Sequence, residues 1–195
     1  MKKIIKSSIY AFLAALTLSG CSKSDLLIDQ VFDNVDSESG VVLRTIEAPE
    51  DLYNNNEGTN IITLTVEVQE GNGSEYPDFK EVRANIRLYA DQDLTEPLTG
   101  SGGSELPERV VATYLPADFE IGSNVLPRKT IEIPTSDVVA LFPDATIPIP
   151  TFIALRFEVE MNDGRVYTNE NLGASVTGGT YFDSRFLYKI IFVNN

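Results

Sequence analysis

Hydrophobic and polar residues alternate along several stretches of the chain, which is the pattern of half-buried β-strands. Within residues 60–69, Ile62, Leu64, Val66 and Val68 fall on one face, and Thr63, Thr65, Glu67 and Gln69 fall on the other. The alternation recurs in residues 82–90 and 153–161. Further stretches rich in β-branched and aliphatic residues are 40–48, 109–115, 129–133 and 185–193. With a return strand at 165–168, these patterns predict seven or eight short strands.

The segments between these stretches predict tight turns and one helix. Asn162-Asp163-Gly164 indicates a hairpin turn in which Gly164 tolerates a positive φ. Thr135 or Ser136 can cap a short helix that Pro143 ends. The apolar positions of this helix are Val138, Val139, Leu141 and Phe142.

These elements predict an all-β fold for residues 40–195, taken as a single domain. Several antiparallel strands joined by Gly, Pro and Asn turns favour a two-sheet β-sandwich of immunoglobulin or fibronectin type III type, with one short helix. The paired cysteines and core tryptophan of antibody domains are absent, because the chain has one cysteine and no tryptophan. We therefore expect only the two-sheet architecture of these domains, without the core features of antibody domains.

The first 20 residues have the plan of a secretory signal peptide. Three lysines in the first six residues precede an apolar run from residue 9 to 18, and the small Ser19 and Gly20 follow. The run is too short for a membrane-spanning helix, which needs roughly 20 residues. We therefore expect residues 1–20 to be removed on export.

Cys21, the only cysteine, directly follows this leader. Leu18-Ser19-Gly20-Cys21 resembles the bacterial lipobox, and this resemblance implies that Cys21 becomes the acylated first residue of the mature protein. A lone thiol in an oxidising compartment would otherwise be a liability. Two or three acyl chains anchor a protein stably, whereas one does so marginally. The alternative is that Cys21 is an ordinary thiol near a normal cleavage site.

Residues 21–39 are expected to form the lipidated cysteine and an acidic tether. Ile28, Val31, Phe32 and Val35 have helical spacing, so a short amphipathic helix or docking segment is an alternative. Without residues 1–20 the chain has 12 basic and 29 acidic side chains, a formal charge of −17. Such a surface repels phosphate backbones, so nucleic acid is not an expected partner.

The candidate chemistry is defined mainly by exclusion. The chain has no histidine, which excludes Ser-His-Asp catalytic triads, Cys-His catalytic dyads and zinc sites with histidine ligands. The glycine-rich stretch at 99–105 lacks the strand-to-helix context of a phosphate-binding loop. Paired carboxylates could serve a glycosidase, but 29 acids make such pairs easy to find by chance. We expect no catalytic residues, metal site or cofactor.

Two loops and four tyrosines are candidates for ligand binding, and each also has a purely structural interpretation. Asp91, Asp93 and Glu96, or residues 54–57, offer hard oxygen ligands for Ca²⁺, although neither has EF-hand spacing. Solvated loop acids are the simpler interpretation. The tyrosines near predicted strand ends could stack on sugars or pack at the edge of the core, and they are Tyr53, Tyr76, Tyr114 and Tyr181.

Four stretches resemble those of small outer-membrane lipoproteins that accompany starch-utilisation-system-like (Sus-like) uptake systems. They are GVVLRTIEAP (40–49), LPRKTIEIPTSDVVALF (126–142), MNDGRVYTNEN (161–171) and VTGGTYFDSRFLYKIIFV (176–193). The resemblance implies a non-enzymatic β-sandwich accessory subunit in a glycan or peptide uptake complex. Its expected partners are the bilayer, a TonB-dependent transporter and that transporter's lid lipoprotein.

The location and the function each have alternatives. Ser22 rather than Asp follows Cys21, so the inner-membrane retention signal is missing, and Lys23 with Asp25 partly resembles the export signal of Sus-like lipoproteins. We expect a lipid-anchored outer-membrane protein at the cell surface rather than on the periplasmic face. An independent carbohydrate-binding lipoprotein is one alternative function, and a small carboxylate-dependent hydrolase is another. The ligand is not identifiable from the residues.

Overall fold

The computed structural model describes residues 40–54, 60–71, 77–173, 176 and 184–193. The predictions for the signal peptide, Cys21 and the tether therefore lie outside the described residues. So do those for Tyr76, Tyr181 and residues 55–57. Within the described residues, no helix is long and apolar enough to cross a membrane.

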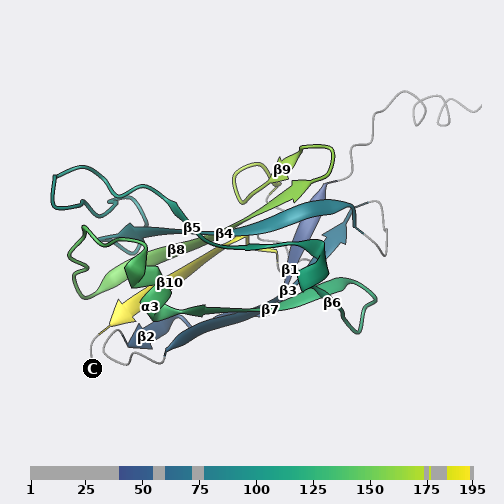
Figure 1. Ribbon diagram of the computed structural model, residues 1–195, viewed down its shortest axis with the longest axis horizontal. Helices are drawn as coiled ribbons and strands as arrows, with labels where there is room; N and C mark the ends of the chain where they lie inside the picture. Colours follow the sequence, from purple (N-terminus) through teal and green to yellow (C-terminus); the bar gives the residue numbers. More distant parts are fainter. Residues whose placement is uncertain (1–39, 55–59, 72–76, 174–175, 177–183, 194–195) are drawn as a thin grey trace, which may run out of the picture. The chain divides into compact units, whose positions relative to one another are not determined.

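Two β-sheets pack face to face, as the alternating pattern predicts (Figure 1). The four-stranded sheet has the order β1-β3-β7-β6, with β1 Val41–Glu47, β3 Ile61–Glu70, β7 Pro127–Pro134 and β6 Glu120–Ile121. The six-stranded sheet has the order β2-β10-β8-β4-β5, and β9 also pairs with β8. Its strands are β2 Leu52–Asn54, β4 Phe79–Tyr89, β5 Arg109–Tyr114, β8 Thr151–Met161, β9 Val166–Tyr167 and β10 Leu187–Val193. The predicted all-β sandwich is confirmed.

The pairing is antiparallel with one exception, because β2 runs parallel to β10. Immunoglobulin sandwiches place strands A, B, E and D in one sheet and C, F and G in the other. With β2, β5 and β9 set aside, the remaining seven strands have this order. Membership of the immunoglobulin or fibronectin type III type itself stays a prediction.

The inward-facing positions of the predicted strands form the core. In β3, β4 and β8, the apolar positions picked out by alternation are at most 2% exposed. They meet Val41 and Leu43 of β1 and Ile131 and Ile133 of β7 in one cluster. Burial of this apolar surface is the main stabilising contribution to the fold.

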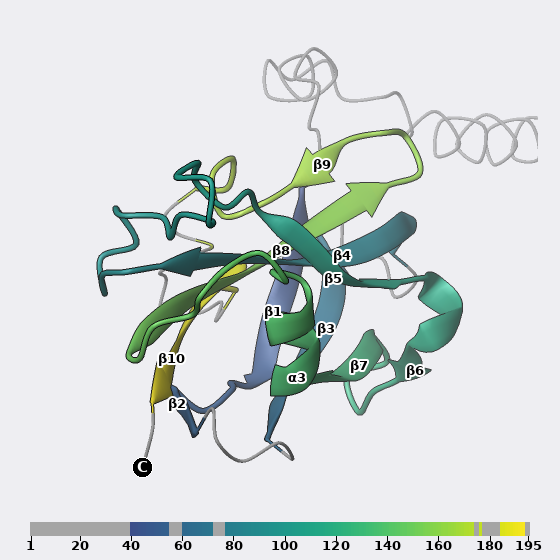
Figure 2. The same ribbon diagram turned by 60° about the vertical axis from the view of Figure 1, so that its left-hand side comes forward.

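The hairpin and the helix form where they were predicted, with one difference. Gly164 has a φ of +89°, and β9 returns beside the end of β8 (Figure 2). The helix α3 spans Thr135–Ala140 and buries Val138. Its N-cap is Pro134 and carries no side-chain cap bond, so the predicted cap by Thr135 or Ser136 is wrong. The short strands β2 and β6 and the 3-10 turn η1, Pro116–Asp118, were not predicted.

Candidate functional site

The outer face of the six-stranded sheet carries charged side chains in rows across the strands. In one row, Arg87 of β4 and Lys189 of β10 lie on either side of Ala154 of β8. The next row places Arg156 between Asn85 and Leu187. These residues occupy positions that alternate with the core-facing ones, so they lie on the outer face of the sheet. Asn85 and Ala154 are nevertheless buried on that face, at 4% and 6% exposed.

A hollow of about 640 Å³ lies over the first of these rows. Ala154 contributes to its lining, and Arg87 and Lys189 flank it. Because a methyl group stands between two long side chains, the sheet surface is locally depressed there. The volume is within the range of small-ligand sites, about 300–1,000 Å³.

Arg156 is held rigidly at one side of the hollow. Its guanidinium donates to both carboxylate oxygens of Glu108 and to Glu158 Oε1, the last at 2.9 Å. The hydrogen bonds to Glu108 raise the pKa of Arg156 above its ordinary value, and Glu158 adds to the effect. Bidentate pairing fixes the plane of the guanidinium, so this side of the hollow is preorganised.

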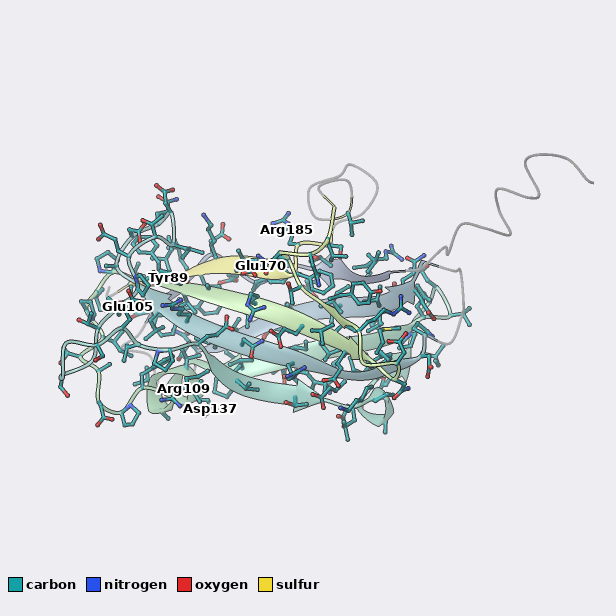
Figure 3. The ribbon with its side chains drawn as sticks, turned by 90° about the horizontal axis from the view of Figure 1, so that it is seen from above. Tyr89, Glu105, Arg109, Asp137, Glu170 and Arg185 are labelled. Carbon is teal, nitrogen blue, oxygen red and sulfur yellow. The ribbon has the colours of Figure 1, made fainter. Side chains whose placement is uncertain are left out.

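Arg87 forms the opposite side together with Tyr89. Its Nη2 donates to Glu105 Oε2 at 2.8 Å, and its guanidinium lies 5.6 Å from the centroid of the Tyr89 ring. Figure 3 shows Tyr89 and Glu105 close together at the same end of the sheet. Among the described residues, the buried Arg87 Nε has no hydrogen-bond partner. This nitrogen has almost no solvent-accessible surface, so it is enclosed within the protein.

The loop after β4 presents two further lining residues, Asp93 and Leu94. Asp91 accepts hydrogen bonds from the backbone N–H groups of Asp93, Thr95 and Glu96, and from the Thr95 hydroxyl. Burial raises the pKa of Asp91, but these hydrogen bonds outweigh it and the net shift is downward. Leu94 has a φ of +59°, a conformation that leucine rarely adopts. The loop is thus fixed by the Asp91 carboxylate.

The segment after β9 borders the hollow from the other side. Thr168 N–H donates to Asn171 Oδ1 at 2.8 Å, and Asn171 Nδ2 donates to the Val166 carbonyl at 2.7 Å. This turn holds Asn169 and Glu170 at the hollow. Asn169 Oδ1 is buried and has no hydrogen-bond partner among the described residues.

The calcium interpretation of Asp91, Asp93 and Glu96 receives no support from the geometry. The Asp91 oxygens face donors of their own loop. In the described part of the chain, no group of three or more Asp, Glu, His or Cys side chains could hold a metal ion. Residues 55–57 of the other candidate loop lie outside that part.

The two described tyrosine candidates lie away from the hollow. Tyr53 is 8% exposed and its hydroxyl oxygen accepts a hydrogen bond from Glu50 N–H at 3.2 Å. It lines a different hollow, together with Glu47 and Leu52. Tyr114 is partly buried, and Lys129 Nζ lies 5.4 Å from its ring centroid. Edge-of-core packing is the interpretation that these contacts favour.

A second charged cluster lies on the outer face of the four-stranded sheet. Glu67 is fully buried and accepts from Arg128 Nε at 2.9 Å and Nη2 at 2.6 Å, and from Arg44 Nη1 and Asn124 Nδ2, both at 3.1 Å. Three of these hydrogen bonds come from the neighbouring strands β1 and β7, and the fourth comes from Asn124 in the turn between β6 and β7. The cluster therefore links β1, β3 and β7 and has a structural role.

Two further hollows lie at the ends of the sheets. One, of about 530 Å³, is bordered by Glu47, Glu50 and Leu52, and the other, of about 440 Å³, by Asp118, Arg128 and Lys129. Neither has a buried side-chain nitrogen or oxygen without a partner in its described lining. Two residues that line the hollow over Ala154, Arg87 and Asn169, each have such an enclosed atom. We take this hollow as the candidate because it has the largest volume of the three and is bordered by two arginines that carboxylates hold in place.

The sequence analysis did not identify the residues of this hollow. A signal was present at alternate positions of two strands, where Arg83, Asn85, Arg87 and Tyr89 face outward in β4, and Arg156 and Glu158 in β8. Comparison with known proteins adds no further assignment, because no protein family and no curated protein matches the chain.

Proposed function

We propose that this protein is a non-enzymatic, lipid-anchored accessory subunit of a Sus-like nutrient uptake complex at the outer membrane. The observation that carries the proposal is the lipobox-like stretch ending at Cys21, together with the stretches that resemble Sus-like accessory lipoproteins. Cell-surface exposure is part of the proposal, because Lys23 with Asp25 partly resembles the export signal of Sus-like lipoproteins.

The geometry of the outer face supports a binding role. The two arginines at the hollow, Arg87 and Arg156, are each held by a carboxylate, as a preorganised recognition surface requires. The two carboxylates beside Arg156 are both engaged by its guanidinium.

The anchor leaves the sandwich free to reach a partner. Nineteen residues, 22–40, separate Cys21 from the first strand, and a fully extended chain spans about 3.3 Å per residue. Even a loosely extended tether therefore reaches several tens of ångströms. The domain can contact the outer lip of a transporter barrel while its lipid stays in the bilayer.

The test is purification of an affinity-tagged copy from native membranes in mild detergent. A stable subunit retains the transporter and its lid lipoprotein in near-equal amounts. Recovery of the tagged lipoprotein alone, with the transporter in the unbound fraction, contradicts the accessory role. That outcome would favour the second candidate, an independent carbohydrate-binding lipoprotein, which the hollow over Ala154 supports.

A further inference from the structure

We propose that the open edge of β5 binds an extended, acidic segment of a partner protein as an additional strand of the six-stranded sheet. This inference goes beyond the proposed accessory role, which names no contact surface. Three features of the edge carry it: its unpaired backbone groups, two cations beside it that form no ion pair, and exposed apolar side chains along it.

The backbone of β5 is paired on one side only. The strand is the last of its sheet and bonds to β4 alone. Alternate residues of such a strand direct their N–H and C=O groups away from the sheet. Apart from β4, no described group hydrogen-bonds to the backbone of Arg109–Tyr114. The edge therefore offers backbone donors and acceptors to an added strand, which is a recurring mode of peptide recognition.

The other outer strands of the two sheets are shorter or already bonded. In β1, Leu43 N–H donates to Ser184 Oγ at 3.1 Å instead of to a strand. The outer strands β2 and β6 have three and two residues, which is too short to hold a long segment. Among the described residues, β5 is thus the sheet edge best able to accept another strand.

One cation lies at each end of this edge. Arg109 is exposed at the start of β5, and Figure 3 shows it at the margin of the sheet. At the other end, Lys129 Nζ lies 5.4 Å from the ring centroid of Tyr114. No ion pair in the described part of the chain includes Arg109 or Lys129.

The nearest carboxylates leave these cations available. Asp118 accepts a hydrogen bond from Leu115 N–H at 2.7 Å, which commits it to the turn after β5. Asp137 of α3 is labelled close to Arg109 in Figure 3, but the two side chains form no ion pair. In a chain with a formal charge of −14, two unpaired cations at one edge favour a partner that brings carboxylates.

Exposed apolar side chains complete the pattern on the opposite face of the strand. Val110 is 49% exposed and pairs with the outward-facing Asn85, and Leu115 just beyond the strand is 52% exposed. Arg109 instead pairs with Ile86, whose side chain is in the core. An added strand therefore meets apolar groups on one face and a cation on the other, so its own residues should alternate between apolar and acidic.

The register of β4 gives the spacing of the acids. From Arg109 to Tyr114, β5 covers the length that β4 covers from Ile86 to Val82, because β5 has one extra residue at its bulge. A regular partner strand spans the same length in four steps. Its two acidic residues should therefore be four positions apart, which places them on the same face.

A second copy of this chain is a less favourable occupant. An antiparallel pair of β5 strands brings Arg109 of each copy toward the end of the other strand where Lys129 lies, so like charges meet. The bulge also increases the local twist of the edge, a device that limits pairing between two sheet edges. A separate extended segment can follow this twist.

The binding test measures fluorescence anisotropy of labelled peptides with the purified full-length protein in mild detergent. The acidic probe is TDVTVDT, which has two Asp residues four positions apart on one face and Val on the other. The matched probes TNVTVNT and TKVTVKT differ only at these two positions. We expect TDVTVDT to bind at least about fivefold more tightly than TNVTVNT, and TKVTVKT to bind most weakly.

A fourth probe separates strand pairing from attraction between charges alone. It is TDVTVDT methylated on the backbone nitrogens of two consecutive central residues. In either register one of these two nitrogens faces β5, so methylation removes a hydrogen bond of the added strand. We expect this probe to bind at least about fivefold more weakly than the unmethylated peptide.

Arg109→Glu tests the position of the site. Lys189→Glu is the matched control, because it makes the same change of charge at an exposed position of β10 in the same sheet. We expect Arg109→Glu to weaken binding of TDVTVDT by at least about fivefold and to strengthen binding of TKVTVKT. Lys189→Glu should leave both within about twofold.

Four outcomes with the peptides overturn the inference. They are no binding of TDVTVDT, equal binding of the three unmethylated probes, no effect of methylation, and equal effects of Arg109→Glu and Lys189→Glu. A dimer that Arg109→Glu dissociates, detected by analytical ultracentrifugation, also overturns it and assigns the edge to a second copy. None of these outcomes depends on Cys21 or on recovery of a transporter, so failure of this inference is distinguishable from failure of the accessory role.

Discussion

At the hairpin between β8 and β9, one residue determines whether the chain can turn. Gly164 has a φ of +89°, and its N–H donates to the Met161 carbonyl at 3.0 Å. A Cβ at this position would meet no described atom within 4 Å. The need for glycine is therefore conformational rather than a matter of space.

We expect Gly164→Val to lower the free energy of unfolding by about 1–3 kcal/mol, because a β-branched residue is forced into the left-handed region. Gly164→Asn is the matched variant, since asparagine tolerates this region and should cost less. Urea denaturation of the three proteins measures the difference. Equal stability of Gly164→Val and the parent protein would show that the turn has another conformation.

Tyr114 gives the protein a predicted loss of stability at high pH. Burial raises the pKa of its hydroxyl from the ordinary 10.0 to about 12, and the nearby Asp118 carboxylate adds to the shift. Between these values the unfolded chain has released the proton and the folded chain has not. The free energy of unfolding should therefore fall as the pH rises from 10 to 12.

Tyr114→Phe keeps the ring but removes the titrating hydroxyl, so we expect a shallower fall over this pH range. Burial also raises the pKa of Tyr53, and its contribution should remain. Denaturant titrations of both proteins across the range give the two slopes. Identical slopes would mean that Tyr114 does not hold its proton in the folded state.

For single residues, the sequence predicted the backbone conformation where the residue type itself favours that conformation. The turn sequence Asn-Asp-Gly predicts a positive φ at Gly164, and the structure confirms it. Leu94, Val125 and Phe186 also have positive φ, and nothing in their residue types indicates it. Leu94 and Val125 lie in tight turns, where their N–H groups donate to the carbonyls of Asp91 and Gly122 three residues earlier. Phe186, in contrast, accepts a hydrogen bond from Phe157 N–H on a distant strand.

At the scale of strands, alternation predicted which side chains form the core because a strand turns successive residues to opposite faces. It did not predict β2 and β6, which have three and two residues and are too short to show a period. It also placed Glu67 on a polar face without indicating that this side chain is fully buried. That burial depends on Arg44 of β1 and Arg128 of β7, which only the strand register brings to it.

The Glu67 cluster yields a prediction about sheet stability. Glu67→Gln keeps the shape of the side chain but removes the charge that Arg44, Asn124 and Arg128 surround. We expect it to lower the free energy of unfolding by about 2–4 kcal/mol. Breaking one partner of a buried ion pair costs about 3–5 kcal/mol, and here the arginines are partly hydrated.

Glu132→Gln is the control, because Glu132 is an exposed carboxylate on β7 of the same sheet. We expect its effect to stay within about 0.5 kcal/mol. Guanidinium denaturation of both variants makes the comparison. Similar effects of the two substitutions would show that the cluster contributes no more than an exposed surface charge.

At the scale of the whole molecule, the sequence predicts the core of the sandwich but not which outward-facing residues lie together on its surface. Composition and alternation suffice for the sandwich because both describe the core. The hollow over Ala154 draws on three strands and two loops, and its lining residues are ordinary outward-facing side chains in the sequence. The strand register, which brings Arg87, Ala154 and Lys189 into one row, is set by long-range pairing and cannot be read from any one stretch.

The proposed outer-membrane location depends on lipidation of Cys21, and the last prediction concerns this residue. We expect Cys21→Ser to accumulate as an unprocessed precursor that no longer fractionates with the outer membrane, because serine offers no sulfur for acylation. Ser22→Ala is the matched control, since it changes the neighbouring residue and keeps the thiol. Membrane fractionation and intact-mass measurement of both variants provide the test. A Cys21→Ser protein of mature mass in the outer-membrane fraction would contradict lipid anchoring, because two or three acyl chains supply the stable attachment that the proposed function needs.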